Sequence, residues 1–389
     1  MLLFKPLPWE YAIRNLFRRP LRTVLTLGVL TTVVLLVFVV VAFVRGLSES
    51  LAASGDPRVA IVYSLGMGEN LEYSAIPGRT ADLVAASVQG IRQRSGKRYV
   101  SPELYLGTQV GWPDALEPSM GLVRGVTPAA LLVRRLVEIE EGGWPGPGEV
   151  LIGRMVAPKL GLPRDRLGVG STLAFEGRSW RVSGVFSASG SVFEAEVWCR
   201  LDELQVAMKR QDLSLVAVTL APGADIADVD LFCKERLDLE LQAIGEADYY
   251  ARLQADYRPV RLLAWLVVVL VSGAGFFSGL NTMYAAALGR TAELATLQTL
   301  GFVRRAIVLS LVQEGVLLAA GASLIATLAA MALFNHVAVR FTMGAFTLRV
   351  DGASVLMGCS IGLLLGLIGA IPPAIRALRI PIVEGLKIV

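Results

Sequence analysis

The segment that organises this chain is Gly289–Arg305, which reads GRTAELATLQTLGFVRR. It is basic at both ends and lies between two long apolar runs. Residues 262–288 contain no charged side chain, and residues 306–339 contain only one, Glu314. A polar segment of this size between two membrane-length helices is predicted to be a loop on one face of a bilayer.

The interior of this loop predicts a short helix. No proline or β-branched run interrupts it, and Gly301 can take the left-handed conformation that ends a helix, with Phe302 folding back on Leu297. A short helix between two spans is well placed to press on a partner protein and to pass motion to the spans. The local pattern equally allows an ordinary connector at the membrane surface.

The composition indicates a membrane protein that also carries a large polar domain. Of its 389 residues, 54% are hydrophobic and 18% are charged, and the mean hydropathy is +0.58. A span needs roughly 20 apolar residues, and four segments qualify: 23–44, 262–288, 306–334 and 353–375. The globular segment between the first two suits one large domain or two small ones.

The basic residues that flank the spans predict the topology. Residues 1–22, 289–305 and 376–389 together contain 11 basic and 3 acidic side chains, whereas residues 45–261 contain 24 basic and 28 acidic ones. We therefore expect the termini and the 289–305 loop in the cytoplasm and the large domain outside it. The net charge of +4 reflects this topology and gives no reason to expect a nucleic acid partner.

The predicted fold class is an α-helical four-span membrane domain with a large α+β extracytoplasmic domain between spans 1 and 2. The expected order is a cytoplasmic amphipathic helix (1–22), span 1 (23–44), the extracytoplasmic domain with its stalks (45–261), span 2 (262–288), a cytoplasmic loop (289–305), span 3 (306–334), a short outer loop (335–352), span 4 (353–375) and a cytoplasmic tail (376–389).

Within the first segment, Pro8 to Arg19 has the pattern of an amphipathic helix. Its apolar residues recur at helical spacing from Trp9 to Phe17, and the other face carries Glu10, Arg14, Asn15, Arg18 and Arg19. A basic amphipathic helix beside a span is expected to lie among the lipid headgroups. A basic flank with accidental periodicity is the alternative.

The large domain alternates strand-like and helical patterns, which indicates an α+β fold with a β-rich middle. Strands are expected at 58–65, 98–105, 122–126, 149–153, 172–175, 179–186, 197–200 and 215–220, helices at 76–93, 128–137, 157–161 and 226–241, a turn-rich break at 140–148 and a polar stalk at 249–261. Cys199 and Cys233 in this domain could form a disulfide or be isolated buried residues.

Two features of the spans suggest close contacts in lipid. Gly275 and Gly279 in span 2 form a GxxxG pattern, and Gly358, Gly362 and Gly366 in span 4 repeat its spacing. Small residues four apart let helices approach closely. The pattern leaves open whether they serve a dimer or packing within one chain.

Glu314 is the single acidic residue of span 3. It lies nine residues beyond Arg305, or roughly 13 Å along a helix at about 1.5 Å per residue. A carboxylate at that depth is costly unless it is paired, faces the bundle interior or is protonated. We expect a structural or gating contact with a basic group of a neighbouring helix, and the alternative is a side chain that reaches the headgroups.

A catalytic function has little support in the sequence. His336 is the one histidine, which rules out a multi-histidine metal site and disfavours a histidine-based triad. The phosphate-binding pattern GxxxxGK[ST] does not occur. We therefore expect no catalytic residue, no metal site and no cofactor bound by this chain, and interpret His336 as a polar residue at the membrane surface.

Several motifs, in this order and around a single large loop, match one family over nearly the whole chain. They are Ala12-Ile-Arg-Asn-Leu16 with Arg18-Arg-Pro-Leu-Arg22, Val123-Arg-Gly-Val126, Gly148-Glu-Val-Leu-Ile-Gly153, Leu160-Gly-Leu162, Glu293-Leu-Ala-Thr-Leu297 with Leu300-Gly301, Glu314-Gly315 and Pro373-Ala374 through Pro381-Ile-Val-Glu384. The chain resembles the permease subunits of the MacB, LolC/LolE and FtsX type of ATP-binding-cassette (ABC) system. Glu314-Gly315 departs from the usual Glu-Ala of that family.

The resemblance implies a MacB-like periplasmic core domain, an FtsX-like transmembrane domain and a mechanotransmission function in the cell inner membrane. An ABC ATPase subunit would hold ATP and Mg²⁺, and this chain, without an ATPase sequence, would act as a homodimer or paired permease that moves periplasmic or lipid-borne cargo. A periplasmic adaptor and membrane lipid are further expected partners. The motif that resembles the coupling segment assigns ATPase contacts to Glu293, Leu294, Leu297, Leu300 and Gly301.

Two other functions remain in competition with this one. A membrane-anchored scaffold or sensor without an ATPase would explain the spans and the outer domain, but not a helix-forming basic loop. A membrane enzyme acting outside the cell is disfavoured because catalytic motifs are missing. The sequence does not identify the cargo.

Overall fold

The computed structural model describes residues 9–18, 20–67, 70–113, 117–334, 337–341, 344–348 and 350–377. The chain forms two compact units. The helical unit comprises Met1–Val44, Pro259–Val337 and Leu348–Val389, and the α+β unit comprises Arg45–Arg258 and Ala338–Thr347.

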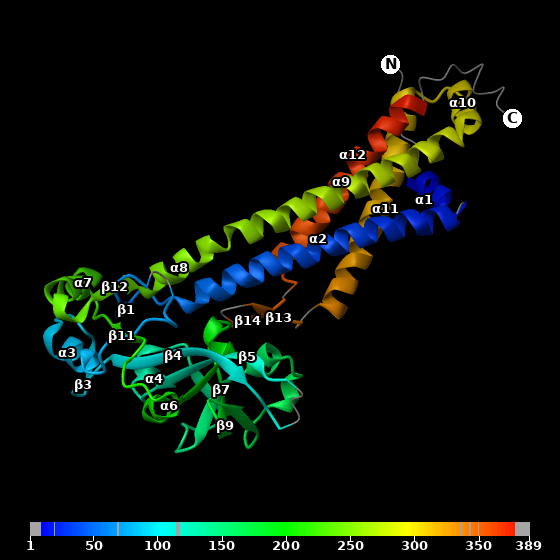
Figure 1. Ribbon diagram of the computed structural model, residues 1–389. Helices are drawn as coiled ribbons and strands as arrows, with labels where there is room; N and C mark the ends of the chain where they lie inside the picture. Colours follow the sequence, from blue (N-terminus) through cyan, green and yellow to red (C-terminus); the bar gives the residue numbers. More distant parts are fainter. Residues whose placement is uncertain are drawn as a thin grey trace. The chain divides into compact units, whose positions relative to one another are not determined.

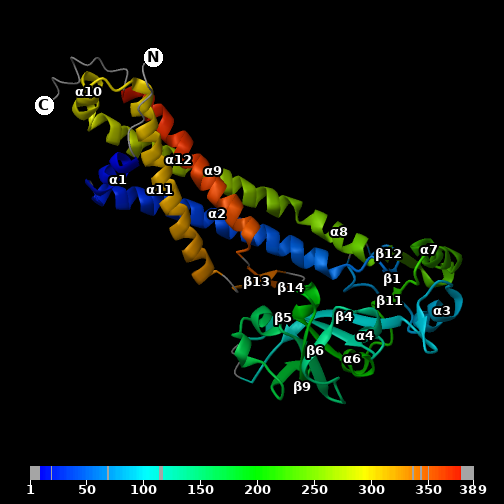
Figure 2. The ribbon, with the colours of Figure 1, turned by 180° about the vertical axis from the view of Figure 1, so that it is seen from behind.

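Long apolar helices make up most of the helical unit. Among the described residues, four are long and apolar enough to cross a membrane: α2 (Pro20–Ser54), α9 (Arg258–Leu288), α11 (Arg304–Leu333) and α12 (Gly352–Ala377). Two short helices accompany them, α1 (Trp9–Arg18), which packs against α11, and α10 (Thr291–Thr299). Figure 1 shows the long helices side by side with α1 and α10 at the same end of this unit, and Figure 2 shows the same arrangement from behind.

Glycines bring α11 and α12 into close contact. A Cβ atom on Gly315 would lie 2.7 Å from the Cβ of Ala370 and 3.0 Å from the carbonyl oxygen of Gly366. One on Gly362 would lie 2.9 Å from Val34 of α2, so this helix also packs closely on α12. Small residues therefore serve packing within one chain here, as expected where helices associate in lipid without a hydrophobic drive.

The two glycines of the GxxxG pattern in α9 have different surroundings. A Cβ on Gly275 would lie 2.7 Å from a methyl group of Val33, so α9 approaches α2 closely at this point. A Cβ on Gly279 would meet no atom of the described chain within 4 Å. Of these two glycines, only Gly275 is therefore required for packing within the helical unit.

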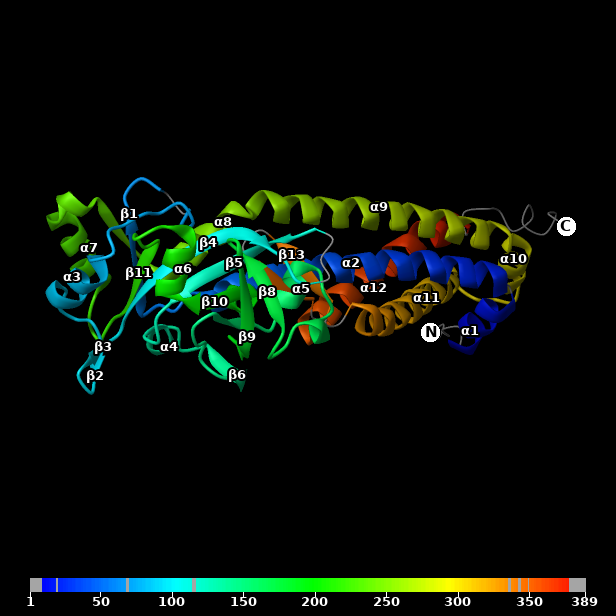
Figure 3. The ribbon, with the colours of Figure 1, turned by 60° about the horizontal axis from the view of Figure 1, so that its bottom comes forward.

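The α+β unit is built on one large sheet (Figure 3). Its described strands follow the order β12-β1-β11-β4-β5-β10-β7-β9-β6, with β8 paired to β9. The bounds are β1 Val59–Ser64, β4 Val100–Val110, β5 Ser119–Val126, β6 Glu138–Gly142, β7 Glu149–Gly153, β8 Thr172–Phe175, β9 Arg178–Ser187, β10 Glu196–Arg200, β11 Leu215–Thr219 and β12 Leu241–Gly245. The small hairpin of β2 (Gln93–Arg94) and β3 (Lys97–Arg98) lies apart from this sheet.

The long strand β4 joins two hydrophobic cores. Its first residues pair with β11 and its later residues pair with β5. One core packs α3 and α7 against β1 and β11 around Val62 and Val229, and the other packs α5 and α6 around Ile152 and Trp180. The helical bounds are α3 Thr80–Ser87, α4 Ala130–Val133, α5 Val156–Leu160, α6 Leu201–Met208, α7 Ile226–Glu235, α8 Glu246–Asp256, and the 3₁₀ turns η1 Arg164–Arg166, η2 Val192–Ala195 and η3 Leu237–Leu239.

Several elements of this unit differ from the sequence prediction. The segment 140–148, predicted to be a turn-rich break, begins inside β6, which pairs with β9. The helix predicted for 226–241 ends at Glu235, because Leu241 begins β12 and pairs with Ser64 of β1. Partner strands supply the backbone hydrogen bonds in both cases, and a local pattern does not reveal a distant partner. The helices predicted for 76–93 and 128–137 are likewise shorter.

The segment expected to be a short outer loop, 335–352, contains a hairpin of β13 (Ala338–Phe341) and β14 (Gly344–Thr347). This hairpin belongs to the α+β unit, although the chain before and after it belongs to the helical unit. Ala338 and Ala345 pack on Met155 and Ala195, and Nζ of Lys159 donates a hydrogen bond to the carbonyl oxygen of Phe341. His336 lies outside the described residues.

The cysteines are free thiols. Cys199 and Cys233 are both buried, and no disulfide joins them. Burial raises the pKa of Cys233 to about 12 and raises that of Cys199 well above its usual range. Both therefore act as small apolar side chains of the two cores.

Candidate functional site: a polar junction beside α10

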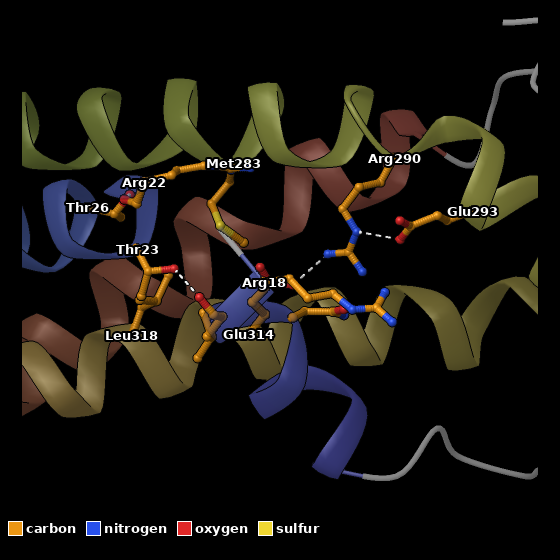
Figure 4. A pocket seen from close by; sticks show the side chains of 11 residues that line it. Arg18, Arg22, Thr23, Thr26, Met283, Arg290, Glu293, Glu314 and Leu318 are labelled. Atoms are coloured by element: carbon orange, nitrogen blue, oxygen red, sulfur yellow. Dashed lines mark hydrogen bonds and ion pairs between the residues drawn. The ribbon is translucent and has the colours of Figure 1, made fainter. Parts of the chain in front are cut away.

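The junction between α9 and α10 is organised by Arg290. Its Nη1 donates to Oε2 of Glu314 on α11 at 3.0 Å, and its Nε donates to Oε2 of Glu293 on α10 at 3.2 Å. Its Nη2 donates to the hydroxyl of Tyr11 on α1 at 3.2 Å. One guanidinium thus connects three helices, and Figure 4 shows its bonds toward the two carboxylates.

The burial of these side chains determines how much free energy an unpaired charge would cost. Arg290 is only 7% exposed and Glu314 is also buried, whereas the Glu293 side chain is 48% exposed. A buried carboxylate in a membrane helix is costly unless a cation accompanies it. The contact expected between Glu314 and a basic group of a neighbouring helix is therefore present, and Arg290 supplies it.

The leucines of α10 and its C-terminal end differ in how far they are exposed. Leu294 is 2% exposed and packs on Ile307 and Leu311 of α11, so it is not available to a partner protein. Leu300 is 70% exposed, and Leu297 is half-buried beside Phe302. Of the leucines predicted to contact an ATPase, Leu300 lies on the surface, Leu297 lies at its edge and Leu294 belongs to the core.

The end of α10 has the geometry expected from its sequence. Gly301 has a φ of +90°, and the backbone N–H of Phe302 donates to the carbonyl oxygen of Leu297 at 3.1 Å. A non-glycine residue would be strained in this left-handed conformation. Gly301 thus acts on the shape of the loop, since it turns the chain from α10 into α11.

The helix α1 presents different faces from those predicted. Ala12 and Asn15 are buried, while Trp9, Ile13 and Phe17 are exposed at a spacing of four residues. Asn15 therefore lies on the packed side, although the sequence pattern places it on the polar face. The exposed apolar stripe fits the predicted location of α1 among lipid headgroups.

A polar pocket lies beside the Arg290 junction within the helical unit. Side chains of α1, α2, α9, α10 and α11 and the Arg290 guanidinium line it, as Figure 4 shows. The hydroxyl of Thr23 on α2 donates to the carbonyl oxygen of Leu16 on α1 at 2.7 Å and fixes one wall. The sequence prediction did not identify this pocket, because its residues are dispersed along the chain.

Among the described residues, no group of three or more His, Cys, Asp or Glu side chains lies close enough together to hold a metal ion. The polar groups of the junction are instead engaged with one another, in an arrangement that links helices. Such a site can hold or release contacts between helices.

Two family models match the sequence over most of its length. Residues 23–230 match the MacB-like periplasmic core domain, and residues 265–382 match the FtsX-like permease C-terminal region. The fold and these matches define the class as a multi-pass membrane protein of the ABC-transporter permease type. The chain belongs to the MacB/FtsX family of these permeases, whose members function with an ABC ATPase.

Solved structures with similarity to the chain include two transporter domains. The periplasmic region of MacB from Actinobacillus actinomycetemcomitans has 10% identity and a TM-score of 0.39, over 53% of this chain and 95% of that one. The extracellular domain of the noncanonic ABC-type transporter YknZ from Gram-positive bacteria has 13% identity and a TM-score of 0.37, over 48% of this chain and 99% of that one. No curated protein matches the sequence. The family assignment therefore rests on the two family models.

Proposed function

We propose that this chain is the permease subunit of an ABC transporter and transmits ATP-driven motion from a partner ATPase to the α+β unit. The ATPase would bind ATP and Mg²⁺, and the α+β unit, outside the cytoplasmic membrane, would move periplasmic or lipid-borne cargo. The chain would act as a homodimer or with a second permease, and a periplasmic adaptor would complete some assemblies. The membrane is the cell inner membrane, with α10 on its cytoplasmic side.

The observation that carries this proposal is the Arg290 junction. If α10 were part of a loosely attached loop, a force on its exposed surface would move α10 without moving the neighbouring helices. Here the buried guanidinium ties α10 to Glu314 of α11 and Tyr11 of α1. Displacement of α10 would therefore shift α11 and α1, because breaking these buried bonds leaves charged groups unpaired.

The connections at the other ends of the long helices support the same function. The helix α2 continues to Ser54 in the α+β unit, and a single residue, Tyr257, separates α8 of that unit from α9. Between α11 and α12 the chain forms the hairpin that packs on Met155 and Ala195. Each of the four long helices thus leads by a short chain connection into the α+β unit, so helix motion has a path to it.

Cysteine labelling in intact cells tests the proposed topology. Ser179 in the α+β unit and Thr299 on α10 are both exposed, and each accepts a cysteine with little change of size. A membrane-impermeant maleimide should label Ser179→Cys in intact cells and Thr299→Cys only after permeabilisation. The wild type is the control, because Cys199 and Cys233 are buried. Labelling of Thr299→Cys from outside would overturn the topology.

Purification of the protein from its native host tests the partnership. We expect an ABC ATPase chain at a fixed ratio to this chain, and added ATP or vanadate should change protease access to the α+β unit. A preparation with no ATPase, and with protease access indifferent to nucleotide, would instead support a membrane-anchored scaffold or sensor.

A further inference from the structure

The small hairpin of β2 and β3 carries a concentration of positive charge. Residues 92–98 read RQRSGKR and include four basic side chains, no acidic one and no apolar one. Every residue from Gln93 to Arg98 is exposed. We call residues 92–98 the basic hairpin, and Figure 3 shows it projecting from the margin of the α+β unit. Its charge is therefore presented to solvent on a narrow ribbon.

The backbone holds the basic hairpin in one shape. The N–H of Arg92 donates to the carbonyl oxygen of Thr219 on β11 at 2.8 Å, and the N–H of Tyr99 donates to the carbonyl oxygen of Arg92 at 2.9 Å. At the tip, Ser95 and Gly96 have φ values of +51° and +77°, the two positive angles of a type I′ hairpin turn. The hairpin is thus anchored to the sheet, and strand pairing decides which of its side chains face each other.

Strand pairing places like charges opposite each other at the tip. Arg94 pairs directly with Lys97, and Gln93 pairs with Arg98. Because successive side chains of a strand point to opposite faces, Arg94 and Lys97 share one face of the ribbon and Arg98 belongs to the other. Like charges directly opposite each other destabilise a strand pair. A local arrangement that costs stability without a compensating contact in the chain is expected at functional sites.

No carboxylate of the chain compensates this charge. Among the residues that the structure describes, none of the four basic side chains of the basic hairpin forms an ion pair. The contacts of Arg92 and Arg98 are with neutral groups, the ring of Tyr99 and the carbonyl oxygen of Val88. Other arginines of the α+β unit pair with a carboxylate two positions away: Arg58 with Asp56, Arg200 with Asp202 and Arg236 with Asp238. The charge of the basic hairpin is thus left for a partner outside the chain.

The composition of the basic hairpin selects the class of partner. Interfaces between folded proteins have an apolar centre, and elements that lie in a membrane surface insert apolar side chains among the headgroups. The basic hairpin contains no apolar side chain for either purpose. Arginine and lysine bind phosphate groups, and their presence on both faces of a ribbon fits a flexible chain of phosphates that can contact both faces at once.

We propose that the basic hairpin binds a linear polyanion with repeated phosphate groups. Arg94 and Lys97 would hold phosphates on one face and Arg98 a further phosphate on the other. The polymer would remove the repulsion between Arg94 and Lys97 and would tether the α+β unit to itself. Binding requires no ATPase, so the proposal goes beyond coupling. The proposed topology decides only on which side of the membrane the polymer lies, and binding by the purified protein is tested separately from it.

Fluorescence anisotropy of labelled inorganic polyphosphate tests the binding. The full-length protein is reconstituted in nanodiscs of phosphatidylcholine, which contribute no negatively charged lipid, and is titrated against the probe. The double variant Arg94→Gln, Lys97→Gln should bind at least tenfold more weakly than the wild type. Rising salt should weaken wild-type binding more steeply than that of the double variant, because each phosphate contact releases counterions. Equal competition by monomeric phosphate at the same total phosphate concentration would make free phosphate the ligand and overturn the proposal.

The hairpin of β8 and β9 supplies a matched control. Its turn residues, Glu176 and Gly177, also have positive φ values, +49° and +69°, and Arg178 and Arg181 of β9 are exposed. The double variant Arg178→Gln, Arg181→Gln removes the same charge from the α+β unit and should keep its affinity within twofold of the wild type. Equal losses in the two double variants would show only attraction to net charge, which contradicts a defined site.

Lys97→Glu separates binding from stability. It converts the like-charged pair with Arg94 into an opposite pair, so thermal unfolding should occur at the wild-type temperature or above it. The affinity for polyphosphate should nevertheless fall at least tenfold. Unchanged affinity in this variant, or no binding of polyphosphate by the wild type, would overturn the proposal. A protein that co-purifies with the wild type and is lost in the Arg94→Gln, Lys97→Gln variant, without polyphosphate binding, would assign the basic hairpin to a protein partner instead.

Discussion

Both units of this protein contain a cluster of arginine and glutamate side chains. The two clusters differ in whether all of their members are buried. In the α+β unit, Arg124 forms ion pairs with Glu103 at 2.7 Å and Glu196 at 2.6 Å, and Arg134 joins Glu103 to Glu246. Every member of that cluster is buried. At the Arg290 junction, by contrast, Glu293 is half exposed and a pocket opens beside the guanidinium.

The closed cluster holds distant elements of the α+β unit together. Glu246 begins α8, and it also accepts a hydrogen bond from the backbone N–H of Asp56, just beyond α2. The Arg124 guanidinium lies over the ring of Tyr105, with its Cζ 4.4 Å from the ring centroid. Because all charges are paired and no side is open, this cluster favours one arrangement. The open junction has an exposed member and adjoining space, so its contacts can change with a ligand or a partner.

The largest effect is expected in the closed cluster. Arg124→Met removes the charge and keeps the bulk of the side chain, and it leaves Glu103 with one arginine and Glu196 with none. Breaking a buried pair in this way costs about 3–5 kcal/mol. Thermal unfolding of the α+β unit, followed by tryptophan fluorescence of Trp180 and Trp198, should shift to much lower temperature. The exposed pair of Arg200 and Asp202 provides the control, since Arg200→Met should leave the unfolding temperature close to that of the wild type.

A substitution at the open junction should lower stability by less than one in the closed cluster. Glu314→Ala leaves Arg290 without its closest acceptor, which costs about 1–3 kcal/mol for an unsatisfied buried group. Glu314→Gln keeps an acceptor oxygen at the same position and should lie between the wild type and Glu314→Ala in stability and transport. Wild-type behaviour of both variants would contradict a role for this ion pair.

Substitutions at the two glycines of α9 distinguish packing within the chain from contact with a second copy. Gly275→Leu should disturb the approach of α9 to α2 at Val33, at a cost of about 1–3 kcal/mol for overpacking. Gly279→Leu meets open space and should leave the isolated chain intact. Size-exclusion chromatography in mild detergent measures both folding and assembly. If Gly279→Leu alone weakens dimerisation, then Gly279 lies in the interface; if neither variant changes the elution, the difference between the two positions has no consequence.

Acid should weaken the closed cluster through Glu103, although by a modest amount. Burial raises the pKa of Glu103, but the charges and hydrogen bonds of Arg134 and Arg124 outweigh it and hold the pKa below its usual range. Its contribution to stability is therefore fully present above the ordinary glutamate pKa of about 4.3 and is lost as the pH falls through the lower folded value. Glu103→Gln should flatten this part of the stability–pH curve, measured by unfolding at pH 3 to 6. An unchanged curve would contradict the assignment.

The sequence predicted the architecture well wherever local pattern dominates. The apolar runs appear as four long helices, Gly301 ends α10 in the left-handed conformation, and Glu314 has a basic partner. These outcomes follow from hydropathy, from the φ that glycine tolerates and from the cost of an unpaired charge in lipid.

Features that depend on distant residues were not predictable in this way. In the sequence Arg290 indicates only membrane topology, whereas in the structure it donates a hydrogen bond to Tyr11, which precedes it by 279 positions. The pattern of polar and apolar residues in α1 places Asn15 on the polar face. That pattern does not show which side of α1 is covered by α11. The closed cluster of Arg124 and Glu196 likewise assembles across β5 and β10, whose pairing is a property of the sheet.

The coupling function is tested most directly by a charge on the exposed end of α10. Leu300→Asp places a carboxylate where an apolar contact with the ATPase is expected, and losing a buried leucine is worth about 1.5–3 kcal/mol, or roughly tenfold to a hundredfold in affinity. Leu237→Asp makes the same change at an exposed leucine of the α+β unit and serves as the control. Co-purification and transport-linked ATP hydrolysis should fall at least tenfold in Leu300→Asp and stay unchanged in Leu237→Asp, with both chains inserted in the membrane. A full complement of bound ATPase and normal transport in Leu300→Asp would contradict coupling through α10.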